Sequence, residues 1–274
     1  MSAEETNSRP ILDHLVILIS ETTLKNLPAL ITNAFTIAPG GEHTGGQTFN
    51  KLILFQDGSY IELIAFYDSV SDEARKAHRW GAAKENTIVD WAFTLNDEAN
   101  FVHVQKRVKD ANGGITYDDP WNMGRKRPDG VDLKWSIGAS RQDDGTPPPP
   151  GTVPFWCLDQ TERSLRVPYE NNSQTKHPSG ILGVAEVLIT TPKSKLDSLK
   201  KVFAGILDGT KHERAEASWS AVVPTVLPAG EPAITVKSRS SDSGEVNRAI
   251  TLIGSASSPK SIELLPGLVF TVRS

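Results

Sequence analysis

The chain has 274 residues, with 29 Lys and Arg, 33 Asp and Glu, and a formal net charge of −4. This length is enough for one large domain or two modest ones with a buried core. No basic stripe of the kind that binds nucleic acid stands out. No stretch approaches 18 consecutive apolar residues, so no membrane span is expected.

The first ten residues are polar and contain no apolar segment of the kind found in a secretory signal. Cys157 is the only cysteine, which excludes an intrachain disulfide and is typical of a reducing compartment. These features predict a soluble cytoplasmic protein whose residues 1–10 form a disordered tail.

The first predicted unit contains a strand, a helix and a hairpin. Residues 11–19, "ILDHLVILI", are so rich in aliphatic side chains that they predict a buried strand. Residues 24–35 carry apolar side chains at helical spacing. After a glycine-rich connector, residues 50–66 read as a β-hairpin that turns at Asp57-Gly58.

The order then repeats along the middle of the chain. Residues 87–95 predict a strand and residues 100–114 a helix, and two more strands follow at 130–138 and 153–159. The stretch "GRKRPDG" at 124–130 is turn-rich and is interpreted as a solvated loop.

A third unit begins at residue 181, with a strand at 181–189 and a helix at 191–207, and strands close the chain. "ILDHLVILIS" resembles "ILGVAEVLIT", and "SYIELIAF" resembles "KSIELLPG". These pairs indicate a duplicated strand–helix–strand–strand module. Chance similarity between short aliphatic strands is the alternative.

His14 and Glu62 are the main candidates for functional residues. A histidine within an aliphatic strand must be hydrogen-bonded, hold a metal or take part in chemistry, because burying an unpaired imidazole is costly. Side chains alternate along a strand, so His14 is expected to share a face with Leu12 and Val16. Glu62 lies in the apolar stretch "YIELIAF", where a buried carboxylate would also need a partner. A buried His14–Glu62 pair without a metal is one answer.

Several stretches together resemble the vicinal oxygen chelate superfamily, and more narrowly its glyoxalase-like domain family. They are "LDHLVIL", "APGGEHTGG", "NKLILFQDGSYIELIAF", "VDWAFTL", "VPFW" and "KHPSG". The resemblance implies an α+β fold in which paired βαβββ modules curl their sheets around a pocket, with helices outside. It predicts a domain of two such units at 11–180, with a third unit at 181–274 packed on it or completing it.

The resemblance also implies a set of metal ligands. His14 and Glu62 carry over from the first unit, and the internal repeat adds Glu186 and Glu263. One imidazole with carboxylates suits Mn²⁺, Fe²⁺, Ni²⁺ or Zn²⁺. Glu186 departs from the usual His or Gln. The middle unit offers no His or Glu on "VDWAFTL" or "VPFW", so a pocket between the first two units would leave two ligands and no metal.

Five further side chains are candidates for substrate binding. His43 lies in a glycine-rich loop that could cover a pocket mouth, and His177 lies in "KHPSG". Tyr60, Trp91 and Trp156 could supply aromatic walls for a partly apolar ligand. Core packing is the alternative for the tryptophans, and an exposed loop is the alternative for His43.

The resulting hypothesis is a glyoxalase-like enzyme that acts on a small oxygenated organic molecule. His14 and Glu62 would be catalytic, and a metal would stabilise an enolate or oxyanion. Isomerase or lyase chemistry follows more easily than dioxygenase chemistry. The alternatives are a non-catalytic binding or sequestering protein and a metal-free biosynthetic catalyst. The expected partner is a small molecule rather than nucleic acid or membrane, and a homodimer is one expected assembly.

Overall fold

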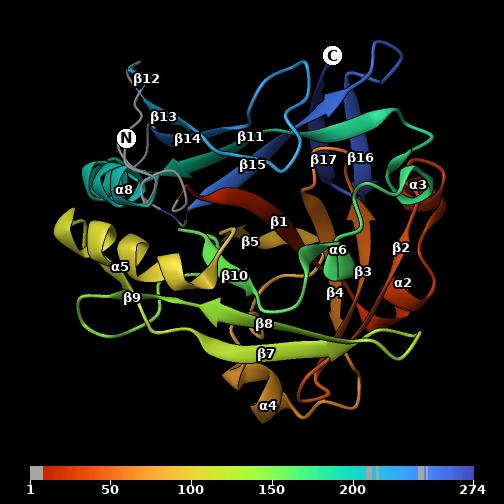
Figure 1. Cartoon of the computed structure of the whole chain (residues 1–274), viewed down its shortest axis with the longest axis horizontal. Coiled ribbons are helices and arrows are strands. Elements are labelled where there is room, and N and C mark those ends of the chain that lie inside the picture. Colours follow the sequence, from red (N-terminus) through yellow and green to blue (C-terminus); the bar gives the residue numbers. More distant parts are fainter. Residues whose placement is uncertain (1–8, 208–211, 214–215, 240–243, 245) are drawn as a thin grey trace.

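The computed structural model describes residues 9–207, 212–213, 216–239, 244 and 246–274. Most of the predicted N-terminal tail, residues 1–8, therefore lies outside the described residues. The chain forms a closed barrel and a second, open sheet that lies over it (Figure 1). Within the described ranges, no helix is long and apolar enough to cross a membrane.

Eight strands close the barrel in the order β1-β4-β3-β2-β7-β8-β10-β5. The first module supplies β1 (Ile11–Leu18), β2 (Ala38–His43), β3 (Thr48–Leu54) and β4 (Tyr60–Phe66), and the second supplies β5 (Thr87–Thr94), β7 (Trp121–Lys126), β8 (Asp132–Gly138) and β10 (Phe155–Asp159). The modules join where β1 pairs antiparallel with β5, and where β2 pairs antiparallel with β7. The predicted fold class, curved sheets around a pocket with helices outside, is confirmed.

The first module has two short helices where the sequence predicted one at 24–35. These are α2 (Glu21–Lys25), capped by the Ser20 hydroxyl, and α3 (Ala29–Thr32). Pro28 causes the break, because it has no N–H to donate and disfavours helical backbone at Leu27. The remaining small elements of the barrel half are α4 (Asp72–Ala77), η1 (Glu98–Asn100), α5 (Phe101–Asp110), β6 (Ile115–Tyr117), β9 (Ser140–Gln142), α6 (Arg163–Arg166) and α7 (Asn172–Thr175).

The C-terminal sheet has the order β12-β13-β14-β11-β15-β17-β16. Its elements are β11 (Ile181–Thr191), α8 (Lys193–Ile206), β12 (His212–Glu213), β13 (Ala217–Ser220), β14 (Ala233–Ser238), β15 (Asn247–Gly254), β16 (Ser261–Leu265) and β17 (Leu268–Arg273). β11 pairs parallel with β14 and antiparallel with β15, as β1 does with β4 and β5. The second sheet therefore repeats the strand order of the barrel in an open form.

This topology corrects the internal alignment made from sequence. His14 pairs with Tyr60 on β4, and Glu186 pairs with Ala233 on β14. The counterpart of Glu62, two residues after Tyr60, is therefore Thr235. Glu263 lies on β16, a strand that corresponds to β8, so the likeness of "SIEL" to "YIEL" is chance similarity.

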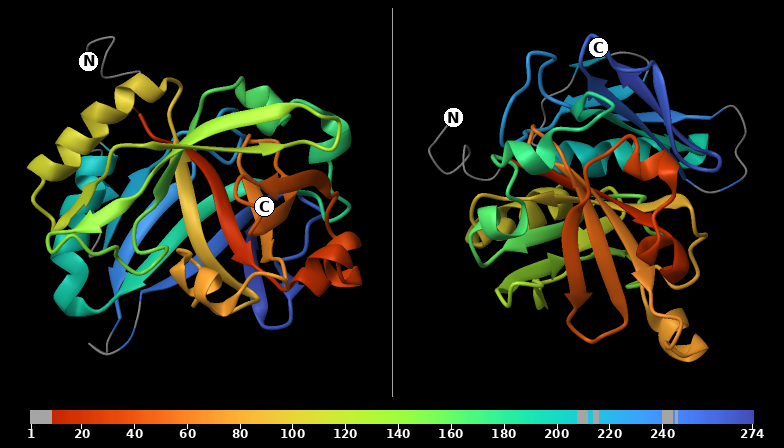
Figure 2. Two further views of the ribbon diagram at one scale, coloured as in Figure 1. Left: turned by 90° about the horizontal axis from the view of Figure 1, so that it is seen from below. Right: turned by 90° about the vertical axis from the view of Figure 1, so that its right-hand side faces the viewer.

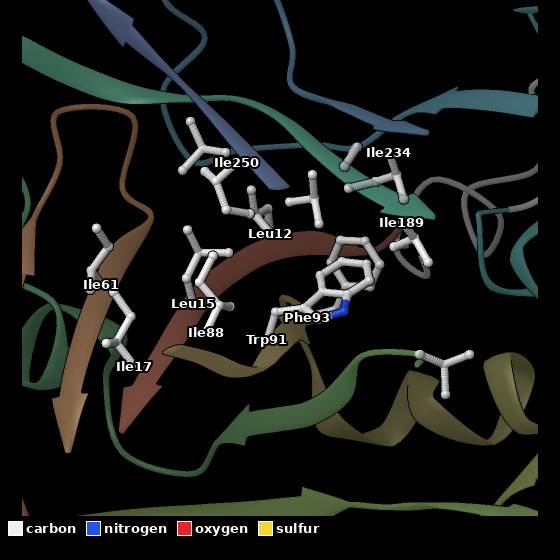
Figure 3. Close-up of a cluster of buried hydrophobic side chains, with 14 of the residues drawn as sticks. Leu12, Leu15, Ile17, Ile61, Ile88, Trp91, Phe93, Ile189, Ile234 and Ile250 are labelled. Carbon is white, nitrogen blue, oxygen red and sulfur yellow. The ribbon is translucent and has the colours of Figure 1, made fainter. Parts of the chain in front are cut away.

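The core between the two sheets is built from the outward faces of β1 and β5 (Figure 3). Leu12 and Leu15 both point toward β11 and β15, although they are three residues apart. The reason is a register shift between Leu12 and His14 in the β1–β5 ladder, because a bulge inserts one residue and inverts the alternation. The expectation that His14 shares a face with Leu12 is therefore wrong, and His14 points into the barrel.

Two contacts hold the halves together at their ends. At one end α5 and α8 pack side by side (Figure 2). There the Arg107 side chain donates to the carbonyl of Gly205 at 3.2 Å. At the other end the β3–β4 turn carries Asp57, which is buried. Its carboxylate accepts from the backbone N–H of Val184 on β11 (2.8 Å) and of Ser59 (2.8 Å).

We expect Asp57→Ala to lower the free energy of unfolding by about 3 kcal/mol, because it leaves two buried N–H groups without an acceptor. Chemical denaturation at pH 7 measures the change. Asp132→Ala, at an exposed position of β8, is the control and should change stability by less than about 0.5 kcal/mol. Equal stability of the two variants would show that the Asp57 contacts do not hold the halves together.

Candidate functional site

The barrel encloses a cavity of about 390 Å³ that opens to solvent beside the half-exposed Trp121. Polar groups cluster on the side of the first module, and apolar groups come mainly from the second. The polar side chains that line it are His14, His43, Gln47, Thr48, Asn50, Tyr60, Glu62, His78, Arg79, Arg125 and Arg166, and the apolar ones include Trp80, Met123, Trp135, Ile137, Phe155 and Cys157.

His14 is held between two carboxylates. Its Nδ1 lies 2.6 Å from Asp13 Oδ2, and its Nε2 lies 3.7 Å from Glu62 Oε2. The imidazole stacks on the Tyr60 ring at 4.6 Å between centroids and is 3% exposed. Both the orientation of the ring and the direction of Nε2, toward the cavity, are therefore fixed.

Asp13 is a fully buried carboxylate that arginines keep ionised. Burial alone would raise the pKa of Asp13, but the charges of Arg163 and Arg166 hold that pKa well below its usual value. Arg166 also bonds to Asp159 and to the Tyr60 hydroxyl (2.7 Å). Because an ionised carboxylate can only accept, His14 must carry a hydrogen on Nδ1.

Glu62 is the polar centre of the cavity. Burial would raise its pKa, but His43, His14 and the Asn50 amide lower it to about 2. Asn50 Nδ2 donates to Glu62 Oε1 at 2.6 Å, and His43 Nε2 lies 3.4 Å from the same oxygen. Glu62 is therefore a fixed negative charge rather than a strong proton acceptor.

The orientation of the Asn50 amide follows from its neighbours. Its Oδ1 accepts from the backbone N–H of Gly41 at 3.0 Å, so its NH₂ group must face Glu62 and His43. Nδ2 lies 3.2 Å from His43 Nε2, while His43 Nδ1 contacts the Thr48 hydroxyl at 2.9 Å. The amide therefore fills the position between His43 and Glu62.

The second module does not repeat the polar pair of the first. His14 pairs with Ala92 across the β1–β5 junction, and Ala92 pairs with Phe155 as His14 pairs with Tyr60. The counterparts of His14 and Glu62 are thus Ala92 and Cys157. Burial raises the pKa of the Cys157 thiol well above its usual value, so Cys157 is a neutral apolar wall.

These residues do not fit the metal centre that the sequence predicted. Half of the paired ligand set is a methyl group and a protonated thiol, and metal binding requires the thiolate. The Asn50 amide donates to Glu62 Oε1 and lies 3.2 Å from His43 Nε2, so it would compete with a metal for these two atoms. Across the described part of the chain, no three His, Cys, Asp or Glu side chains are grouped as metal ligands.

The other predicted ligands lie outside the cavity. Glu186 is on β11 of the open sheet, where its carboxylate accepts from the Thr235 hydroxyl at 2.6 Å. Glu263 is exposed on β16 and accepts from the backbone N–H of Gly267. Because the barrel closes from the first two modules alone, neither carboxylate approaches His14. The four predicted ligands therefore do not form one metal site.

The predicted substrate contacts divide into two groups. His43 and Tyr60 line the cavity. Trp91 and Trp156 are completely buried in the core outside the barrel, where Trp91 stacks on Phe203 of α8 and Trp156 packs against Phe101 of α5. Both tryptophans lie on strands, as predicted, but their side chains point away from the cavity. The prediction that they contact substrate is therefore wrong.

His177 serves as a link in the scaffold and is not among the cavity residues. Its Nε2 lies 2.9 Å from the carbonyl oxygen of Leu54, and its Nδ1 accepts from the backbone N–H of Thr36. Burial lowers the pKa of His177 to about 4. It joins the segment before β11 to the end of β3.

Sequence reasoning missed several of the cavity residues. Arg125 was assigned to a solvated loop, although it lies on β7 and is 6% exposed. Asp13 is next to His14 in the sequence, and Arg163 and Arg166 are three residues apart, so that they can share one helical face. No sequence pattern indicates that these arginines contact Asp13. Asn50 lacks any signal except its place on a strand beside Glu62.

A family model described as "Glyoxalase-like domain" matches residues 12–205, which span the whole barrel and reach into α8. The chain belongs to this family. The comparison with curated protein sequences found no match.

Two solved structures illustrate the fold. A hypothetical protein from Staphylococcus aureus is 16% identical with a TM-score of 0.66, over 96% of this chain and 99% of that chain. A xylose isomerase-like TIM barrel/4-hydroxyphenylpyruvate dioxygenase fusion protein is 12% identical with a TM-score of 0.51, over 90% of this chain and 37% of that chain. At these identities the likeness shows the fold alone. Nearly the whole chain, including the open sheet, shares its fold with the first of them.

The pKa of His177 predicts an acid-sensitive contribution to stability. The folded pKa of about 4 lies below the unfolded value of 6.5, so the contribution is present above pH 6.5 and is lost as pH falls toward 4. Between pH 7 and 4.5 we expect His177→Gln to lose about 2 kcal/mol less stability than the wild type. Denaturant unfolding at both pH values tests this, with the exposed His103→Gln as control. Parallel declines in all three proteins would contradict it.

The donor set predicts weak metal binding. After purification without chelator we expect elemental analysis to find well below one divalent ion per chain, unchanged in His14→Ala. Stoichiometric metal that disappears in His14→Ala would show that Asn50 and Cys157 rearrange to admit an ion.

Proposed function

We propose that this protein is an enzyme that moves a proton on a small oxygenated organic molecule, with His14 as the acid–base group and without help from a metal. The observation that carries the proposal is the placement of His14 Nε2 toward an aromatic-walled cavity, with Nδ1 tied to the Asp13 carboxylate at 2.6 Å. Histidine is the side chain that most often acts as an acid or base in enzymes, and a third group such as a carboxylate commonly orients it.

The protonation states follow from the contacts. Asp13 accepts the Nδ1 hydrogen, so the lone pair of neutral His14 is on Nε2 and faces the cavity. Glu62, whose Oε2 is 3.7 Å away, stabilises the imidazolium that forms when Nε2 takes a proton. Glu62 itself, with a pKa of about 2, is too weak a base to be the proton acceptor.

The chemistry is proton abstraction from a carbon next to a carbonyl group, followed by reprotonation. The C–H proton passes to His14 Nε2, the electron pair of that bond forms the enolate, and the proton returns to carbon or oxygen. Burial raises the pKa of Tyr60 well above its usual value, so Tyr60 stays a neutral phenol whose oxygen accepts from Arg166 and whose O–H can donate a hydrogen bond. This is isomerase- or lyase-type chemistry.

The ligand is expected to be a small, partly apolar molecule. The volume of about 390 Å³ falls at the lower end of small-molecule sites, and Trp80, Trp135 and Phe155 provide flat apolar walls. A cytoplasmic location and a homodimeric assembly stay predictions from the sequence.

Deuterium exchange tests the proposal. We expect the protein in D₂O with EDTA to exchange the protons next to the carbonyl in α-hydroxyketones or 2-oxo acids, of which 2-hydroxyacetophenone and 2-oxo-4-phenylbutanoate are the first probes. His14→Gln should lower the exchange rate at least about 100-fold, because it removes the proton acceptor. NMR of the probe measures the rate.

Two controls accompany this experiment. His103→Gln, on the exposed face of α5, should exchange at the wild-type rate. Asp13→Asn should lower the rate while leaving probe binding in place, because it releases the Nδ1 hydrogen. A probe that binds in the cavity but exchanges at the same rate with and without His14 would identify a binding protein instead.

A further inference from the structure

Among the described residues, most buried charged side chains at the cavity contact an opposite charge or a hydrogen-bond donor. Arg163 and Arg166 contact Asp13 and Asp159, and Arg79 contacts Asp90. Glu62 accepts from the Asn50 amide and lies within 4 Å of the His14 and His43 rings. Arg125 remains, and among the described residues no carboxylate forms an ion pair with it.

Arg125 is buried as well as unpaired. Its residue is 6% exposed, and its Nη1 has no hydrogen-bond partner within the part of the chain that the structure describes. Burial lowers the pKa of Arg125, although Tyr60 and Glu62 oppose that effect. A guanidinium stays protonated at this depth, so the protein maintains a desolvated charge at a cost in stability.

The position of Arg125 is set by the junction of the two modules. It lies on β7, where its backbone is the partner of His43 on β2. Its Nη1 passes against Gly41, 3.5 Å from where a Cβ of that glycine would lie, and Arg125 lines the cavity together with His14 and Glu62. A buried guanidinium that lines the cavity without a carboxylate partner among the described residues is suited to bind an anionic group of a ligand.

We propose that Arg125 binds a carboxylate group of the ligand, which makes the ligand class small apolar or aromatic monocarboxylates. The planar guanidinium fork matches a carboxylate in shape and charge. A carboxylate is favoured over a phosphate because Arg125 supplies one positive charge and Glu62 is already ionised nearby. A dianion would leave a negative charge facing Glu62. The rest of the ligand would lie against Trp80, Trp135 and Phe155.

This assignment deepens the proposed function and relies on it for the location of the reacting atoms, but binding can be measured without turnover. The probes are phenylacetate, its neutral isostere phenylacetamide, and phenylphosphonate. Binding is followed by the fluorescence of the cavity tryptophans and by the thermal unfolding midpoint. We expect the wild type to bind phenylacetate at least tenfold more tightly than phenylacetamide, and more tightly than phenylphosphonate.

Arg125→Gln is the decisive variant. It should weaken phenylacetate binding at least tenfold and change phenylacetamide binding less than threefold, and it should raise the unfolding midpoint of the ligand-free protein. Arg273→Gln removes one charge from the exposed face of β17 and should bind like the wild type. Arg125→Lys keeps the charge but not the fork, so it should retain a reduced preference for the carboxylate. If Arg125→Gln does not fold, the binding of phenylacetate and phenylacetamide to Arg125→Lys tests the assignment instead.

Three outcomes would overturn the assignment. They are equal binding of phenylacetate and phenylacetamide by the wild type, a preference that survives Arg125→Gln, and tighter binding of phenylphosphonate. His14→Gln separates the two proposals. If His14→Gln keeps carboxylate binding and the wild type never shows deuterium exchange, the acid–base proposal is wrong and the carboxylate site is retained. If exchange depends on His14 but binding ignores Arg125, only the carboxylate site fails.

Discussion

The structure of the cavity depends on one irregularity, the bulge at Asp13 in β1. It places Leu12 and Leu15 together in the core between the sheets and leaves His14 pointing inward. Without the extra residue, alternation along the strand would send either the leucines or the imidazole to the wrong side. The same residue supplies the carboxylate that holds His14, so a single insertion provides both the packing and the orientation of the acid–base group.

The two modules of the barrel have divided their roles. The first contributes His14, His43, Asn50 and Glu62, and the second contributes Phe155, Cys157 and Trp135 at facing positions. A symmetrical pair of modules would surround an ion with polar groups from both sides. Here one wall is polar and the other is apolar. This arrangement orients a ligand that has one charged end and one apolar end. Arg125, contributed by the second module at the seam with the first, is the exception that the carboxylate proposal explains.

The open sheet shows why closure matters for function. Its strand order repeats that of the barrel, and among the described residues the carboxylate of Glu186 accepts from the hydroxyl of Thr235. Because this sheet is open, Glu186 is half-buried, and none of the residues that line the barrel cavity comes from it. One face of the open sheet instead packs into the core shared with β1 and β5 (Figure 3).

The sequence by itself determined the aliphatic strands, the order of the modules, the family, and the two polar residues that had to be explained, because aliphatic periodicity and a buried histidine are local signals. It did not determine β2 and β7, whose glycines and charged residues are typical of loops. It did not determine which modules pair, the bulge that turns Leu12 outward, or the faces of Trp91 and Trp156. It also did not reveal Arg125, Arg166 and Asn50 as partners of the site. These depend on register and on contacts between residues up to about 150 positions apart, such as Asp13 and Arg166. Such contacts form only once the sheets have closed, so only the tertiary structure decided them.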